Sequence, residues 1–415
     1  ATKHARSRGA PGDAPRPMIF VDGLVAYLRA YLSALATALQ SLWPFPKIDE
    51  AGTRHVMEPL SYRRAVFLLL FPVFPLLQLF HAVCLGLDHL LFPAFRSTTL
   101  RSPVFVLGVP RSGTTFIHRE LARDPNFTAP RTWELLFAPS ICQRYLVQAL
   151  GRLDRAAGAP LARASRALLA GTMRDVNEVH PLGLSAAEED YLALLPCGGC
   201  FFASMAFPDS SRFRSLAGLD GLKPVEKTRI LEHYHALLQR QVFFHGNKQL
   251  LSKNAAFAAW TPYIAARYPD AKILMCIRDP ATALASQLSS LQGARRAFGT
   301  FPRPEDLERR FSEHYNDWWR ALAREVESLD PPPLVIEQEW LRHHRKPALQ
   351  LIYDRLGTQA PAVVAGSDAS TSGRKGSAPP AREASWHLHD ESVAGMQAPY
   401  SLLCRVARSQ RETPS

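Results

Sequence analysis

A glycine-bracketed turn carries the clearest chemical signal in the sequence. It follows an apolar run that begins at Val104 and reads Gly108-Val-Pro-Arg-Ser-Gly-Thr-Thr115, ahead of a helical apolar pattern. The spacing fits the G-x-x-x-x-G-[K]-[ST] phosphate loop, in which backbone N–H groups and a helix N-terminus hold an anion. Thr114 stands where nucleotide hydrolases carry lysine, and the nearest cation is Arg111 inside the loop. The turn is therefore predicted to hold a phosphate, but with a different leaving group.

Residues 110–115 resemble, without a gap, the first signature of the sulfotransferases that use 3′-phosphoadenosine 5′-phosphosulfate (PAPS). Residues 87–93 and 132–134 are similar to the large, mostly uncharacterised branch of that family with a hydrophobic N-terminal extension. The resemblance implies an α/β fold with a P-loop-type parallel sheet flanked by helices. It also implies in-line transfer of a sulfuryl group from PAPS to an acceptor hydroxyl. The donor-binding residues of the loop would be Arg111, Ser112, Gly113, Thr114 and Thr115.

A second buried apolar run ends at Arg278, and Pro280 suits the first turn of the helix that follows and carries Ser286. Ligands of doubly wound sheets bind beyond the carboxyl ends of the strands, so both residues are expected on the same rim as the loop. The pair resembles the second family signature, which holds the 3′-phosphate of PAPS. The alternative is an arginine paired with Asp270 or Asp279 and a serine on the helix surface.

Sulfuryl transfer needs cations on the sulfuryl oxygens and on the departing phosphate, and a base for the acceptor hydroxyl. Arg111 can supply charge to the leaving group, and Lys253 resembles the family lysine that reaches the sulfuryl group. The resemblance also implies a catalytic base at Glu134, whose pKa an aromatic neighbour can raise towards neutrality. His180, before a proline, is the alternative base because it needs no pKa shift near pH 7.

Two further clusters favour structural explanations. The acidic run 188–190 is interpreted as part of a capping box, Ser185-Ala-Ala-Glu188, that opens an apolar helix. Cys197 and Cys200 have no further ligands at zinc spacing, which favours free thiols or one local disulfide. No metal site is predicted, and the chemistry is expected to need no metal because loop cations can meet the charge of a sulfuryl group.

The composition limits the range of partners. The 415 residues carry a formal net charge of +12, with forty arginines against nine lysines, but the charge is scattered and forms no block. This argues against a nucleic-acid partner. The rival functions are a P-loop nucleotide kinase or hydrolase, which the absent loop lysine disfavours, and a non-catalytic, membrane-associated nucleotide-binding module.

Strand and helix patterns alternate from residue 103 onward, which is typical of a parallel sheet covered by helices. Strands are predicted near 103–108, 248–252, 271–277 and 333–337, and helices near 113–123, 144–169, 186–195, 224–244, 256–267, 280–293, 304–328 and 345–356. The predicted organisation is a disordered segment 1–17, a hydrophobic helical extension 18–100, a P-loop sulfotransferase domain 101–357, and a C-terminal loop and tail 358–415.

Residues 65–87 form an apolar stretch of 23 residues without a formal charge, long enough for a bilayer span of about 20 residues. Pro72, Pro75, Gln78 and His81 argue against a span and favour a hydrophobic hairpin or a monotopic patch. We therefore expect membrane association, at the cytoplasmic face or, in a eukaryote, in the Golgi lumen. An amphiphilic or lipid-linked hydroxyl is the favoured acceptor. Residues 18–45 are predicted to form an amphipathic helix.

Overall fold

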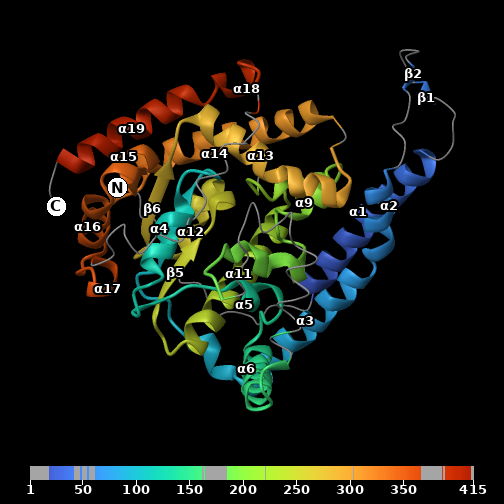
Figure 1. Ribbon diagram of the computed structural model, residues 1–415, viewed down its shortest axis with the longest axis horizontal. Helices are drawn as coiled ribbons and strands as arrows, with labels where there is room; N and C mark the ends of the chain where they lie inside the picture. The colour runs from blue at the N-terminus through green and yellow to red at the C-terminus, as the bar shows by residue number, and fades with distance from the viewer. Residues whose placement is uncertain are drawn as a thin grey trace, which may run out of the picture.

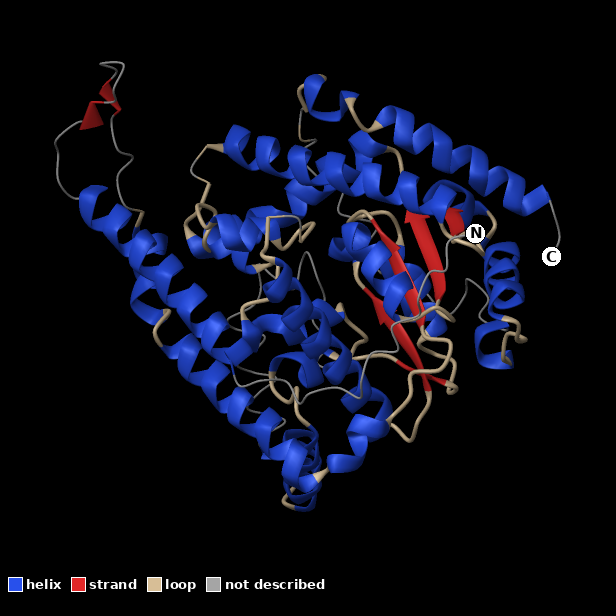
Figure 2. Cartoon of the chain, turned by 180° about the vertical axis from the view of Figure 1, so that it is seen from behind, coloured by secondary structure: helices blue, strands red, loops and turns tan. Residues whose placement is uncertain are grey.

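The computed structural model describes residues 18–41, 47–48, 54–55, 61–160, 163, 185–219, 221–301, 303–365, 386 and 388–412 (Figures 1 and 2). The predicted disordered segment 1–17 and the candidate base His180 lie outside these residues.

A parallel sheet forms the centre of the described part of the chain (Figure 2). Its five strands run in the order β4 (Phe127–Thr128), β5 (Gln249–Lys253), β3 (Val104–Gly108), β6 (Lys272–Ile277) and β7 (Leu334–Glu337). The four predicted strands and the parallel arrangement are confirmed. Strand β4 was not predicted, because a two-residue strand leaves no periodic pattern to detect. Continuous apolar runs suit these strands because helices cover a parallel sheet on both faces.

The helices of the sheet domain mostly match their predicted positions. They are η1 (Pro93–Ser97), α4 (Thr114–Leu121), α5 (Thr132–Leu136), α6 (Ile141–Ala156), η2 (Asp190–Cys197), α9 (Ala203–Ala206), α10 (Ser211–Ser215), α11 (Pro224–Phe244), η3 (Ala255–Trp260), α12 (Thr261–Arg267), α13 (Pro280–Phe298), α14 (Pro304–Ser328), α15 (Gln338–His343), α16 (Arg345–Leu356), α17 (Ala362–Ala365), α18 (Glu391–Ala394) and α19 (Gln397–Glu412).

Three predicted helical features need correction. Helix α6, predicted over 144–169, spans Ile141–Ala156. It begins three residues earlier than expected because Ser140 and Gln143 form a capping box at its start, and it ends before a turn at residues 157–158. The helix predicted over 186–195 is the 3₁₀ helix η2, whose N-cap is Glu189. The predicted Ser185 capping box does not form because this segment is paired instead: Thr132 N–H donates to Ala186 O, and the N–H of Glu188 donates to Pro130 O.

The C-terminal segment 358–415, predicted as a loop and tail, contains a long helix. Helix α19 packs beside α14 and β7 (Figure 1). Leu403, Cys404 and Ala407 form its buried face, and the amide of Gln410 bonds the backbone of Val335 and Pro333. In the sequence, this helix is indicated only by an amphipathic pattern that follows a long polar segment.

The hydrophobic extension consists of α1 (Met18–Ser41), a small antiparallel pair β1 (Lys47–Ile48) and β2 (Arg54–His55), α2 (Tyr62–Leu70) and α3 (Val73–Leu91). The helix predicted over 18–45 is confirmed for Met18–Ser41, and residues 42–45 lie outside the described residues. Helices α2 and α3 continue along one line, with α1 beside them (Figure 1). Two stretches, Ile19–Gln40 and Tyr62–Leu91, are long and apolar enough to cross a membrane, a test that the core helix of a soluble protein also passes.

The hairpin expected within residues 65–87 is therefore wrong. Pro72 is the N-cap of α3, and Pro75 occupies the third position of that helix. The first four N–H groups of a helix have no partner within it, so neither proline costs α3 a hydrogen bond. The prolines separate two helical segments without reversing the chain.

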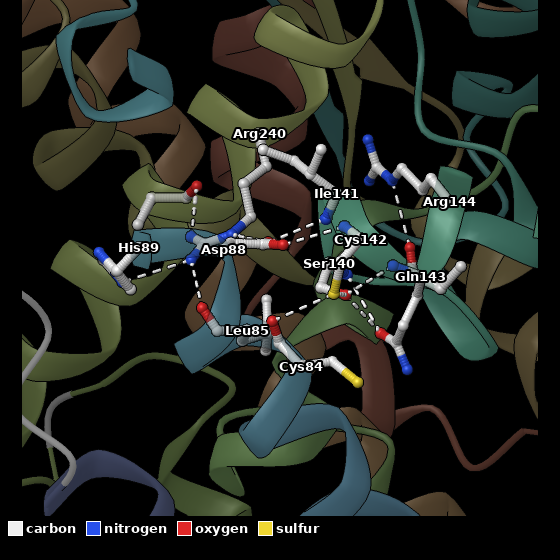
Figure 3. Close-up of polar contacts among 12 residues, drawn as sticks. Cys84, Leu85, Asp88, His89, Ser140, Ile141, Cys142, Gln143, Arg144 and Arg240 are labelled. Carbon is white, nitrogen blue, oxygen red and sulfur yellow. Dashed lines mark hydrogen bonds and ion pairs between the residues drawn. The ribbon is translucent and has the colours of Figure 1, made fainter. Parts of the chain in front are cut away.

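A buried ion pair fixes the extension to the sheet domain (Figure 3). The carboxylate of Asp88 on α3 accepts from Arg240 Nε of α11 at 2.8 Å, and both side chains are at most 1% exposed. The same carboxylate accepts from the backbone N–H groups of Ile141 and Cys142 at 2.8 and 3.0 Å, at the positive end of α6. Because an unpaired buried charge is costly, this contact holds α3, α6 and α11 in a fixed arrangement.

A second buried carboxylate, Asp190, fixes η2 to the carboxyl end of β5. It accepts from Ser252 Oγ at 2.6 Å, from Tyr234 OH at 2.9 Å and from Asn254 Nδ2 at 3.5 Å. Burial raises the pKa of Asp190 from its ordinary value of 3.8 to about 6, although these three hydrogen bonds act in the opposite direction. The turn before η2 is thereby held next to Lys253, the last residue of β5.

This environment predicts that the free energy of unfolding depends on the charge of Asp190. Because its pKa is raised on folding, the stabilisation is complete below pH 3.8 and is lost as the pH rises through about 6. Relative to Asp190→Asn, the native chain should lose on the order of 3 kcal/mol between about pH 4 and pH 7. Urea denaturation of both proteins across this range measures the difference. If the stability of the native chain relative to Asp190→Asn stays constant or increases as the pH rises, the assigned pKa of Asp190 is wrong.

Candidate active site

The turn between β3 and α4 has positive φ angles at three residues, two of which are glycines. Gly108 and Gly113 have φ of 151° and 95°, and a Cβ on Gly108 would lie 2.3 Å from the carbonyl oxygen of Cys276. Arg111 is held at φ 67°, a strained conformation for a residue with a side chain. The hydroxyl of Tyr315 on α14 donates to Pro110 O at 2.8 Å and supports the turn from behind. The turn presents the N-terminus of α4 as a preformed anion cradle.

The structure brings together the predicted donor-binding side chains. Arg111 Nε donates to Ser286 Oγ at 3.0 Å, and Arg278 Nη1 donates to Arg111 O at 3.3 Å. Gly108 of β3 is in register with Cys276 of β6, so Arg278 and the loop leave the sheet at the same edge. In this arrangement two guanidinium groups and a hydroxyl lie beside the cradle, as an anion with two phosphate groups requires.

The alternative partners of Arg278 are engaged elsewhere. Asp279 is the N-cap of α13 and accepts from the backbone N and the Oγ1 of Thr282 at 2.8 and 2.6 Å. Asp270 accepts from the backbone N of Ser102. The hydrogen bond from Arg278 to Arg111 O is the contact that places Arg278 on the loop side of the sheet.

Lys253 lies between the loop and the acidic turn that carries Glu188 and Glu189. Its Nζ donates to Thr115 Oγ1 at 3.0 Å, and the residue is 2% exposed. The same Nζ is 3.0 Å from Glu189 Oε1 and 3.6 Å from Glu188 Oε1. The side chains of Glu188 and Glu189 are 20% and 24% exposed, so solvent reaches the carboxylates but hardly reaches the ammonium group. The sequence favoured a helix cap for this acidic run and left a substrate role open, because members of the resembled family carry a similar acidic pair. Its position beside Lys253 depends on contacts between distant segments, which leave no local signal in the sequence.

Glu134, the base implied by the resemblance, is fully buried and hydrogen-bonded. Its Oε1 lies 2.7 Å from His245 Nε2, and its Oε2 accepts from the backbone N of Arg131 at 2.8 Å. Burial alone would raise the pKa of Glu134, but the charge of Arg144 and the hydrogen bond to His245 outweigh it and lower the pKa. The pKa of Glu134 is therefore not raised towards neutrality, and its role as base, which the resemblance implies, stays a prediction.

Cys197 and Cys200 are free, buried thiols. Burial raises the pKa of Cys197 to about 12 and that of Cys200 further, which makes both unreactive. Among the described residues, no three His, Cys, Asp or Glu side chains gather as a candidate metal site.

Comparisons with known proteins show which family this chain resembles. The family model described as Sulfotransferase family matches residues 103–362. A relative from Mycobacterium bovis, omega-hydroxy-beta-dihydromenaquinone-9 sulfotransferase Stf3, is 24% identical over 271 residues, which cover 61% of this chain and 62% of the relative. The Stf3 of Mycobacterium tuberculosis gives the same values. The chain thus matches less than two thirds of the length of these relatives.

Two solved structures share the fold. Sulfotransferase STF9 from Mycobacterium avium has a TM-score of 0.61 at 15% identity, covering 91% of this chain and 95% of its own. Sulfotransferase STF1 from Mycobacterium tuberculosis H37Rv has a TM-score of 0.54 at 17% identity, covering 92% and 91%. At these identities the likeness concerns the fold alone. The match of the family model to more than half of the sequence identifies this chain as a member of the sulfotransferase family.

Proposed function

We propose that this protein transfers a sulfuryl group from PAPS to an acceptor hydroxyl. The carrying observation is that Arg278 and Ser286 each contact Arg111 beside the loop, while Lys253 contacts the loop at Thr115. The loop would hold the 5′-phosphosulfate, and Arg278 and Ser286 would hold the 3′-phosphate. The tight backbone approach at Gly108 fits this use, because a cradle for phosphate must present N–H groups without side chains in the way.

The reaction distributes charge over the same groups. The acceptor oxygen forms a bond to sulfur while the bond from sulfur to the 5′-phosphate oxygen breaks, and 3′,5′-adenosine diphosphate leaves with that electron pair. Arg111 would meet the charge on the departing phosphate. Lys253 would meet the sulfuryl oxygens, because its ammonium group is already held at Thr115 by a 3.0 Å hydrogen bond.

A base must take the proton of the acceptor hydroxyl. The exposure of Glu189 beside Lys253 favours this residue as a further candidate. A base must lie within hydrogen-bond reach of the acceptor hydroxyl. Glu189 is partly exposed beside Lys253, whereas Glu134 is enclosed and its carboxylate oxygens are occupied. The geometry therefore supports Glu189 as the base, while the sequence resemblance supports Glu134 with His180 as its alternative. Asp190, anchored to Ser252, would hold Glu189 in position.

We further propose an amphiphilic or lipid-linked acceptor at a membrane surface. Only 22% of the apolar window in Tyr62–Leu91 is buried, so this stretch does not simply cover the sheet as core. Exposed apolar area on this scale is unusual in a soluble monomer and marks an interaction site. The Stf3 relatives are named for a menaquinone derivative, which is itself an amphiphile.

Donor binding tests the first proposal. The chain should bind 3′,5′-adenosine diphosphate without metal, and Arg278→Ala should weaken this binding about 10- to 100-fold, because a hydrogen bond to a charged group contributes about 1.5–3 kcal/mol. Arg296→Ala, an exposed change on the same rim helix α13, serves as the matched control. Calorimetric titration measures the binding of 3′,5′-adenosine diphosphate to the native chain and to both variants. If ATP binds with Mg²⁺ while the diphosphate does not, the protein is a P-loop kinase or hydrolase instead.

Turnover of matched glutamine variants tests the base. Glu189→Gln should lower kcat by about two to four orders of magnitude with little loss of donor affinity, because a base acts on the acceptor and not on the donor. Glu188→Gln, one residue away and farther from Lys253, should keep kcat within about tenfold. Glu134→Gln should chiefly lower the free energy of unfolding. If Glu134→Gln abolishes turnover in a stable protein while Glu189→Gln does not, the base is Glu134.

A further inference from the structure

Helix α3 carries its polar side chains inside the protein and its apolar side chains outside. Gln78, His81 and Asp88 are buried. The opposite face exposes large apolar side chains at helical intervals: Leu76, Phe80, Val83, Leu87 and Leu90. A helix that covers the core of a soluble protein has the reverse polarity. The outer face of α3 is therefore built for an apolar environment.

Helix α6 shows the same inversion, although its sequence contains no long apolar run. Gln143 and Arg144 are buried. Its outer surface exposes Tyr145, Leu146, Val147, Leu150 and Leu153. The amide of Gln143 donates to His81 Nδ1 of α3 at 2.9 Å, so the inward polar side chains of the two helices bond each other.

The two helices form one rigid unit. Asp88 accepts from the first two backbone N–H groups of α6, and Arg240 closes the contact from α11 (Figure 3). Phe92, just after α3, stacks on Tyr145 of α6 with ring centroids 5.5 Å apart. Figures 1 and 2 both show α6 beside the C-terminal end of α3. We call the exposed residues of α3 and α6 named above the α3–α6 surface.

We propose that the α3–α6 surface docks on an anionic lipid bilayer, with α6 entering the same leaflet as α3. The exposed part of α3 has no formal charge, whereas Arg96 after α3 and Arg152 and Arg155 on α6 are exposed. Arginine side chains near an apolar surface can extend to phosphate headgroups while their stems stay in the apolar layer. This inference deepens the proposed membrane association by naming its surface and its lipid.

Vesicle flotation of the full chain tests the role of α6. The double variant Leu146→Glu, Leu150→Glu places two carboxylates on α6, outside the proposed donor site. Val225→Glu, on α11 and 52% exposed, is the matched control. The native chain and the control should float with phosphatidylglycerol-containing vesicles and less with phosphatidylcholine alone. The fraction of the double variant that floats should fall tenfold or more, since two leucines leave the apolar layer and two carboxylates take their places.

Binding of 3′,5′-adenosine diphosphate, measured on the same samples, separates this inference from the proposed function. Unchanged binding by the double variant shows that it is folded. Equal flotation of the double variant and the native chain would overturn the inference. A second result would also overturn it: a native chain that does not bind vesicles but is a dimer in analytical ultracentrifugation, together with a double variant that is a monomer. The α3–α6 surface would then bind a second copy of the chain. If the native chain floats with vesicles but does not bind the nucleotide, the proposed sulfotransferase function is refuted, whereas the inference about the α3–α6 surface is supported.

Discussion

The buried ion pair between Asp88 and Arg240 is the contact on which the arrangement of the whole molecule depends. It lies between an apolar helix and the sheet domain, where an unpaired charge would be strongly destabilising. Helix α11 carries Arg240 and, almost two turns earlier, Tyr234, which donates to Asp190. Asp190 in turn follows Glu189, which contacts Lys253 at the phosphate loop. Helix α11 and the segment 189–190 thus join the buried Asp88–Arg240 pair to the contact between Glu189 and Lys253 at the candidate active site.

The two ends of this series suit the two proposed substrates. At one end, strained backbone and converging cations prepare the loop for a highly charged nucleotide, and Tyr315 holds the loop in place. At the other end, helices with inverted polarity offer an apolar surface, and their polar side chains bond one another inside. An enzyme that joins a water-soluble donor to an amphiphilic acceptor needs both environments in a fixed relation, and the rigid packing of α3 against α6 and α11 provides it.

The sequence predicted those features that depend on local patterns. Apolar runs located four strands, and the order of the loop, Lys253 and Arg278 along the chain sufficed to place them on one rim. Features set by distant contacts were missed. The pairing of residues 130–132 with 186–188 turned an expected capping box into an acidic turn at Lys253, and Arg144 with His245 lowered the pKa of Glu134. The apolar face of α6 leaves only a weak signal in the sequence, because the exposed Gln148 and Arg152 interrupt the apolar run.

Sulfuryl transfer itself is the most direct test of the central claim. The purified full chain would be incubated with ³⁵S-labelled PAPS and a panel of acceptors, comprising long-chain alcohols presented in anionic vesicles and free sugars in solution. Label should appear in the vesicle-borne alcohols, in the presence of a metal chelator and with release of 3′,5′-adenosine diphosphate. Label found only in soluble sugars would refute the amphiphilic acceptor. A chain that binds the nucleotide but labels no hydroxyl in a broad panel would contradict the assignment of this protein as an active sulfotransferase.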